Sequence, residues 1–136
     1  MERLVSASEH AGILAKQSGA DLLRLSSGDL FIGKDEKRNL AAASFLNLAQ
    51  IDAEAPGNHE FDITASICGN LLKDSKTKIL GMNLNFPNVP SNLSKKVMRS
   101  TIFDGKNGEK YGLIGIQPSD INERLKKKEI LLIFSN

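Results

Sequence analysis

Gly57-Asn58-His59-Glu60-Phe61-Asp62 is the polar segment around which this chain is organised, and a second polar loop, residues 26–33, lies upstream of it. Each loop follows a short apolar run that is typical of a β-strand. Because the carboxyl ends of parallel strands meet at one edge of an α/β sheet, both loops should lie at that edge. A carboxylate, an amide oxygen and an imidazole, from Asp29, Asn58 and His59, then converge. These groups suit a divalent cation such as Mn, Zn or Fe.

The composition is ordinary for one globular domain. The chain has 136 residues, of which 40% are hydrophobic and 25% charged, and its net charge is +2. This small charge gives no electrostatic reason to expect binding to nucleic acid or to an anionic membrane. No apolar run approaches the roughly 20 residues that span a bilayer, and residues 1–4 do not begin a signal peptide. The single cysteine, Cys68, excludes an internal disulfide and should be a small buried side chain.

The apolar pattern predicts an α/β fold. Successive strand–helix units should build a mainly parallel sheet, and an antiparallel hairpin should finish it. Strands are predicted over residues 20–26, 52–56 and 78–85, hairpin arms over 97–103 and 111–116, and helices over 2–18, 35–49 and 63–73. A last helix, capped by Ser119 or Asp120, is predicted to run to Lys128. A long loop is predicted over residues 86–94, and such loops often border functional sites.

Several single residues carry expectations of their own. The first helix has a narrow, alanine-rich apolar stripe that suits packing against the sheet, and His10 beside this stripe should lie at the surface. Glu54 occupies a position where a central parallel strand usually buries an apolar residue. Asp62 can pair with His59, cap the following helix, or do both. Glu60 is expected to be structural or exposed and is given no functional role.

The two motifs resemble those of a known family of hydrolases. Gly28-Asp29 followed by Gly57-Asn58-His59-Glu60 is similar to the calcineurin-like metallophosphoesterases, and Phe61-Asp62 is most similar to their 5′-nucleotidase branch. The resemblance runs from about Leu4 to about Asp120. It implies half of an αββα sandwich, and a domain that hydrolyses phosphomonoesters with two divalent metal ions.

The resemblance also implies roles for four residues. Asp29 would bridge the two metal ions, and Asn58 would bind the second of them. His59 would stabilise the transition state or protonate the leaving group, and Asp62 would pair with His59. A carboxylate beside an imidazole favours the imidazolium, which can neutralise charge on a phosphoryl group or supply a proton. The implied substrate is a small-molecule phosphate ester, a nucleotide in the 5′-nucleotidase branch.

Other motifs of the family are missing from this sequence. The family needs an Asp-x-His motif before the Gly-Asp motif, and a histidine and a Gly-His-x-His motif after the second loop. This chain has only two histidines, His10 and His59. Residues 1–136 are therefore expected to be an incomplete catalytic domain, with a truncation or frameshift near Glu129. Metal binding should be weak or partial, and phosphatase activity of the isolated chain should be little or none.

Three functional hypotheses follow. The first is a fragment of a 5′-nucleotidase-like hydrolase, and the second is a non-catalytic remnant or a weak phosphate-binding module. The third, an unrelated α/β binding protein, requires both motifs to be coincidental. Members of the family are often periplasmic or on the cell surface, although this chain shows no export signal. Near its end, Lys126–Lys128 is expected to be a solvated helix end, and residues 130–134 form an uncharged, β-prone run.

Overall fold

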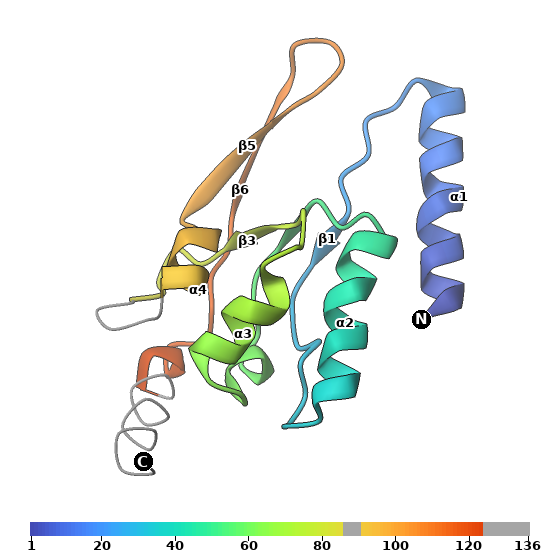
Figure 1. Ribbon diagram of the computed structural model, residues 1–136. Coiled ribbons are helices and arrows are strands. Elements are labelled where there is room, and N and C mark those ends of the chain that lie inside the picture. Colours follow the sequence, from blue (N-terminus) through green and yellow to red (C-terminus); the bar gives the residue numbers. More distant parts are fainter. Residues whose placement is uncertain (86–90, 124–136) are drawn as a thin grey trace, which may run out of the picture.

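A computed structural model of the chain, which describes residues 1–85 and 91–123, shows a small parallel sheet and an antiparallel hairpin (Figure 1). The sheet contains β1 (Leu25–Ser26), β2 (Ala53–Glu54), β3 (Lys78–Leu80) and β4 (Val97–Met98), in that order, and neighbouring strands are parallel. The hairpin consists of β5 (Ser100–Asp104) and β6 (Lys110–Ile114). The predicted α/β class, with a mainly parallel sheet and a hairpin, is confirmed.

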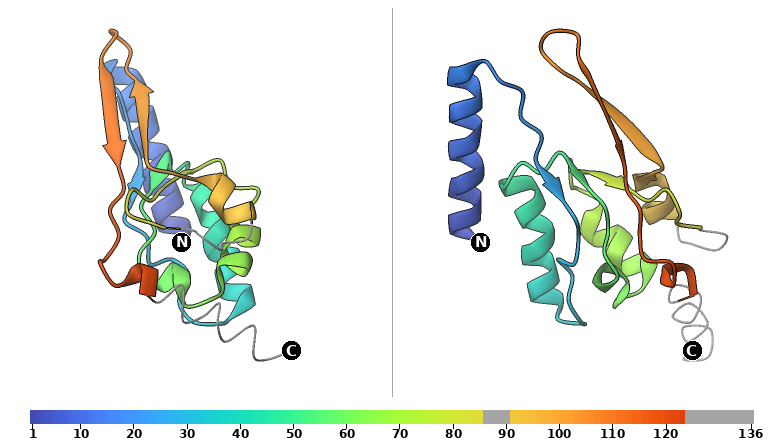
Figure 2. Two further views of the ribbon diagram at one scale, coloured as in Figure 1. Left: turned by 90° about the vertical axis from the view of Figure 1, so that its left-hand side faces the viewer. Right: turned by 180° about the vertical axis from the view of Figure 1, so that it is seen from behind.

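Two helices cover one face of the sheet (Figure 2). Asp35 caps α2 (Glu36–Leu48) by accepting a hydrogen bond from the Arg38 N–H at 3.0 Å. Thr64 caps α3 (Ala65–Leu72) by accepting one from the Ile67 N–H at 3.3 Å. Side chains from both helices and from β3 fill the core, among them Ala42, Leu46, Cys68, Leu72 and Ile79. Cys68 is buried, as predicted.

The strands are shorter than predicted, and the region after β3 differs from the expectation. Val97 and Met98 form the last parallel strand instead of the start of the hairpin. A helix that the sequence did not reveal, α4 (Ser91–Lys96), precedes them and packs against α3. The end of the predicted loop at 86–94 is therefore helical, and its residues 86–90 lie outside the described part.

The first helix has the predicted bounds but not the predicted packing. It runs over Glu2–Ser18 as α1 and ends at Gly19, whose φ of 72° is in the left-handed region. None of its residues is buried, and it stands beside α2 instead of against the sheet (Figure 1). Its alanine-rich stripe offers little apolar area for packing, and polar contacts hold the helix to the rest of the chain. Ser8 Oγ donates a hydrogen bond to the Ala49 carbonyl, and the Arg24 guanidinium donates one to the Ser8 carbonyl. His10 is exposed, as predicted.

The segment after β6 runs back along the face of the sheet opposite α2 and α3 (Figure 2). The Met82 N–H donates to the Gly115 carbonyl at 2.8 Å, and the Gln117 side chain donates to the Leu80 carbonyl at 2.8 Å. A helical turn begins at Ile121. Beyond residue 123, the predicted remainder of this helix, Lys126–Lys128 and the run 130–134 fall outside the described residues. Within residues 1–85 and 91–123, no helix is both long and apolar enough to cross a membrane.

Candidate functional site

The two polar loops meet at the carboxyl ends of β1 and β2. These strands pair in parallel, with Ser26 opposite Glu54, so the chain leaves both strands at one edge of the sheet. The loops approach so closely that only glycine fits at two positions. A Cβ atom on Gly28 would lie 2.2 Å from the Gly57 nitrogen, and a Cβ atom on Gly57 would lie 2.2 Å from Asp29 Oδ1. The glycines before Asp29 and Asn58 therefore permit the contact between the loops.

Glu60 makes four hydrogen bonds that hold the two loops together. Its side chain is fully buried. Oε2 accepts hydrogen bonds from the Asp29 N–H at 2.8 Å and the Gly57 N–H at 2.6 Å. Oε1 accepts from the Leu30 N–H at 2.6 Å and the Phe31 N–H at 3.2 Å. No functional role was expected for Glu60, which the sequence shows only as one more polar residue of the second loop.

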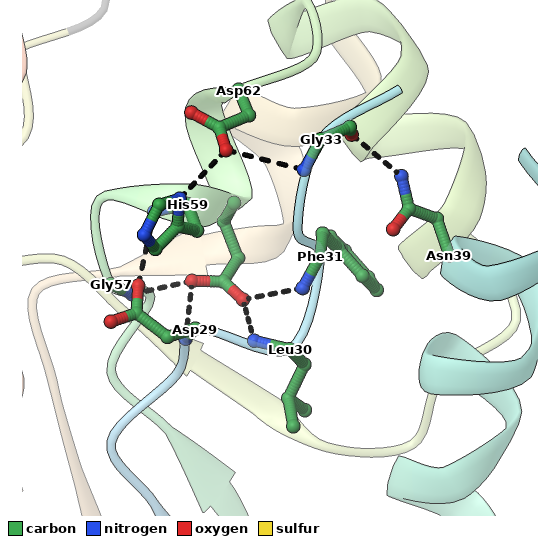
Figure 3. A network of polar contacts seen from close by, with 9 residues as sticks. Asp29, Leu30, Phe31, Gly33, Asn39, Gly57, His59 and Asp62 are labelled. Atoms are coloured by element: carbon green, nitrogen blue, oxygen red, sulfur yellow. Dashed lines mark hydrogen bonds and ion pairs between the residues drawn. The ribbon is translucent and has the colours of Figure 1, made fainter. Parts of the chain in front are cut away.

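His59 and Asp62 lie next to one another on the second loop. His59 opens a short 3₁₀ helix, η1 (His59–Phe61), and its Nδ1 lies 2.7 Å from Asp62 Oδ2. The same oxygen accepts a hydrogen bond from the Gly33 N–H at 3.2 Å (Figure 3). The hydrogen bond between the His59 ring and the Asp62 carboxylate, which accepts it, raises the pKa of His59 above its ordinary value of 6.5. Because Thr64 caps α3, the alternative that Asp62 caps this helix is wrong.

Asp29 lies beside this pair. Its Oδ1 accepts a hydrogen bond from the backbone N–H of His59 at 3.0 Å, and its φ is 59°. Asp29 is exposed, whereas Asn58 is partly buried at the start of η1. The structure thus brings Asp29, His59 and Asp62 together, with Asn58 immediately before His59 in the same loop.

The possible metal ligands at this edge of the sheet are chemically suited to a divalent cation, but there are few of them. The Asp29 carboxylate and the Asn58 amide oxygen are hard ligands of the sort that Mn or Zn accepts. Among the described residues, however, no group of three or more His, Cys, Asp or Glu side chains could hold a metal ion. A stable metal site generally needs about four protein or solvent ligands or more. Further ligands would therefore have to come from outside this group of residues.

A second buried carboxyl group, that of Glu54, lies in the core behind the loops. It is 1% exposed, and neither of its oxygens has a hydrogen-bond partner within the described part of the chain. Its register opposite Ile79 in β3 places it on the face of the sheet that packs against α2 and α3. Burial, and secondly the negative charge of Glu60, raise the pKa of Glu54 to about 8. Glu54, the residue that is unusual for a central strand, is therefore a buried acid that holds its proton below a pH of about 8.

Comparisons with known proteins agree with this description at the level of the fold. No protein-family model and no curated protein matches the chain. The 5′-nucleotidase precursor from Thermus thermophilus matches 73% of this chain and 20% of its own, with 28% identity and a TM-score of 0.65. The calcineurin-like phosphoesterase YfkN from Bacillus subtilis matches 90% of this chain and 42% of its own, with 19% identity and a TM-score of 0.59.

The chain thus spans less than half the length of either solved structure. At 19% identity, the match to YfkN concerns the fold alone. The match to the Thermus protein has a higher sequence identity, 28%. The predicted resemblance, which was based on Gly28-Asp29 and residues 57–62, is confirmed. This chain has part of the calcineurin-like metallophosphoesterase fold, and it is similar to a 5′-nucleotidase precursor over most of its own length.

Proposed function

We propose that this chain is part of a metal-dependent phosphomonoester hydrolase that resembles the 5′-nucleotidases, and that the isolated chain has little or no activity. The observation that carries this proposal is the pairing of His59 with Asp62 directly beside Asp29, at the carboxyl edge of a parallel sheet. The similarity to a protein named as a 5′-nucleotidase precursor supports a nucleotide as the substrate.

Each residue has a distinct part in the proposed site. Asp29 and Asn58 would hold divalent metal ions, which in such enzymes polarise phosphoryl oxygens and lower the pKa of bound water. The Asp62 carboxylate orients the His59 ring and favours its protonated form, since Nδ1 donates to Oδ2. The other ring nitrogen, Nε2, is then an N–H donor for a phosphoryl oxygen, or a proton source for the departing alkoxide.

Weak metal binding explains the expected inactivity. Two side-chain ligands provide only part of the affinity and geometry that a divalent ion needs. The purified chain should therefore hydrolyse 5′-AMP in the presence of Mn²⁺ no faster than an Asp29→Asn variant does. A clear Mn²⁺-dependent rate that Asp29→Asn abolishes would support the hydrolase assignment and contradict the inactivity of the isolated chain.

Metal binding can be tested without turnover. Mn²⁺ broadens the NMR signals of nearby nuclei, so a small amount should broaden the backbone amide signals of residues 28–31 and 57–62 first. Asp29→Asn should reduce this broadening. The matched control is Asp104→Asn, which removes an exposed carboxylate on the hairpin that pairs with Lys110. Equal broadening in both variants, or none at these residues in the unmodified chain, would contradict the proposed roles of Asp29 and Asn58.

A further inference from the structure

We infer that Glu60 is a positioning residue, whose buried carboxylate sets the place of the Asp29 side chain relative to His59. This inference rests on the proposed function, in which Asp29 and His59 act together. Glu60 itself faces backbone N–H groups of the two loops, and its four hydrogen bonds divide evenly between its two oxygens. It therefore acts through Asp29 and not on a substrate.

The four hydrogen bonds join segments that no strand pairing joins. The N–H groups of Asp29, Leu30 and Phe31 come from the loop after β1, and the N–H of Gly57 comes from the loop after β2. A carboxylate that is fully buried requires such donors, because an unpaired charge in the core is strongly unfavourable. The loops thus depend on Glu60, and Glu60 depends on both loops.

The same contacts hold Asp29 in an unusual backbone conformation. Its φ of 59° is left-handed, which is uncommon for residues other than glycine, although aspartate tolerates it better than most. Three consecutive N–H groups, starting with that of Asp29, point at the Glu60 carboxylate. In this conformation Asp29 Oδ1 reaches the His59 N–H at 3.0 Å. Loss of the Glu60 acceptors should therefore release this hydrogen bond, although Glu60 takes no part in it.

The substitution that tests this inference is Glu60→Gln, which keeps the shape of the side chain. Whichever way the new amide is oriented, its NH₂ group faces two of the four N–H donors, because each oxygen of Glu60 serves two of them. The matched control is Glu54→Gln. It makes the same chemical change in a neighbouring buried glutamate whose oxygens have no hydrogen-bond partner among the described residues.

The first measurement is the rate of backbone amide hydrogen exchange, followed by NMR in both variants. Glu60→Gln should speed exchange by about tenfold or more at Asp29, Leu30, Phe31, Gly57 and also His59, while Glu54→Gln leaves these five amides within about twofold. Unchanged exchange at these amides in Glu60→Gln would overturn the inference. So would a change that spares His59, because the positioning of Asp29 would then not depend on Glu60.

The Cys68 and Leu72 amides in the buried part of α3 report whether the core survives. If Glu60→Gln exposes them as well, Glu60→Asp is measured in its place. This variant keeps the charge, but its side chain is one carbon too short to accept hydrogen bonds from both loops. Faster exchange at the same five loop amides would again support the inference, and unchanged exchange there would overturn it.

Mn²⁺ broadening separates this inference from the proposed function. If the unmodified chain shows no broadening at Asp29 and Asn58, the metal assignment fails, and hydrogen exchange still decides whether Glu60 positions Asp29. If broadening occurs, Glu60→Gln should require about tenfold more Mn²⁺ to reach it, whereas Glu54→Gln should not. Broadening at the same Mn²⁺ concentration in Glu60→Gln as in the unmodified chain would overturn the positioning role.

Discussion

His59 Nδ1 lies 2.7 Å from Asp62 Oδ2, and the same carboxylate oxygen accepts a hydrogen bond from the Gly33 N–H at 3.2 Å. One side chain of the second loop thus fixes the imidazole and also fastens the end of the first loop. Removing the charge of Asp62 while keeping its shape should therefore be visible directly in the titration of His59.

We expect Asp62→Asn to lower the pKa of His59, because the hydrogen bond to Asp62 is the main cause of its increase. Since the pKa is raised in the folded state, the stabilisation from this pair is complete below the unfolded value of 6.5 and is lost as the pH rises through the folded value. NMR titration of the imidazole protons measures the shift. Asp104→Asn is the control, and equal His59 curves in the two variants would contradict the pairing.

The pKa of Glu54 predicts a second pH dependence. Its folded value of about 8 exceeds the ordinary 4.5, so the folded state holds a proton that the unfolded state releases. The free energy of unfolding should therefore decrease as the pH rises from 4.5 toward 8, by about 2 kcal/mol between pH 6 and pH 8. Glu54→Gln should remove this part of the dependence. Urea denaturation at the two pH values measures it, and an equal decrease in both proteins would rule out Glu54 as the cause.

Gly28 should tolerate no side chain. Its φ is 80°, and a Cβ atom would meet the Gly57 nitrogen at 2.2 Å, whereas Gly108 has a φ of 81° with no described atom within 4 Å of its Cβ position. Gly28→Ala should destabilise the fold by about 3 kcal/mol or more, and Gly108→Ala by about 1 kcal/mol from the backbone alone. Urea denaturation compares them. Similar losses would mean that the two loops do not approach as closely as described.

Cys68 provides a probe of unfolding. Burial raises the pKa of its thiol, and the nearby negative charge of Glu60 acts in the same direction. We expect a thiol reagent such as Ellman's reagent to label the native chain about a thousandfold more slowly than the chain in urea. A variant with Cys68→Ser and Ser119→Cys, whose new thiol is exposed, controls for the reagent. Comparable labelling of the native chain and the control variant would contradict the burial of Cys68.

The sequence predicted the topology better than the lengths of its elements. Alternating apolar runs separated by helical patterns indicated the parallel sheet and the hairpin, and both are present. Strand bounds were too long because apolar residues such as Leu22 and Leu23 continue the pattern beyond the two paired residues of β1. The helix α4 was missed because Pro87 and Pro90 favour a loop, and a six-residue helix has no visible apolar period.

At the candidate site, motif positions indicated which residues would meet, but not how they are held. The convergence of Asp29 with His59 follows from two strand ends in one parallel sheet. The role of Glu60 could not be predicted in this way. Its partners are backbone N–H groups, which nearly every residue type has, so the identities of the partner residues give no indication of the contact. The burial of Glu54 could not be predicted either, because a charged residue in a strand is usually exposed.

The packing of α1 can be tested by replacing one leucine in α1 and one leucine in α2 by alanine and comparing the losses of stability. Leu14 in α1 is 51% exposed and Leu46 in α2 is fully buried. If α1 is attached mainly through the polar contacts of Ser8, Leu14→Ala should change the free energy of unfolding by less than about 0.5 kcal/mol. Leu46→Ala should lower it by about 3 kcal/mol, because it leaves a cavity in the core. Both variants replace leucine by alanine within a helix, so their intrinsic helix propensities cancel. Urea denaturation measures both values. A loss at Leu14 that approaches the loss at Leu46 would mean that α1 packs on an apolar surface, as its alanine-rich stripe first suggested.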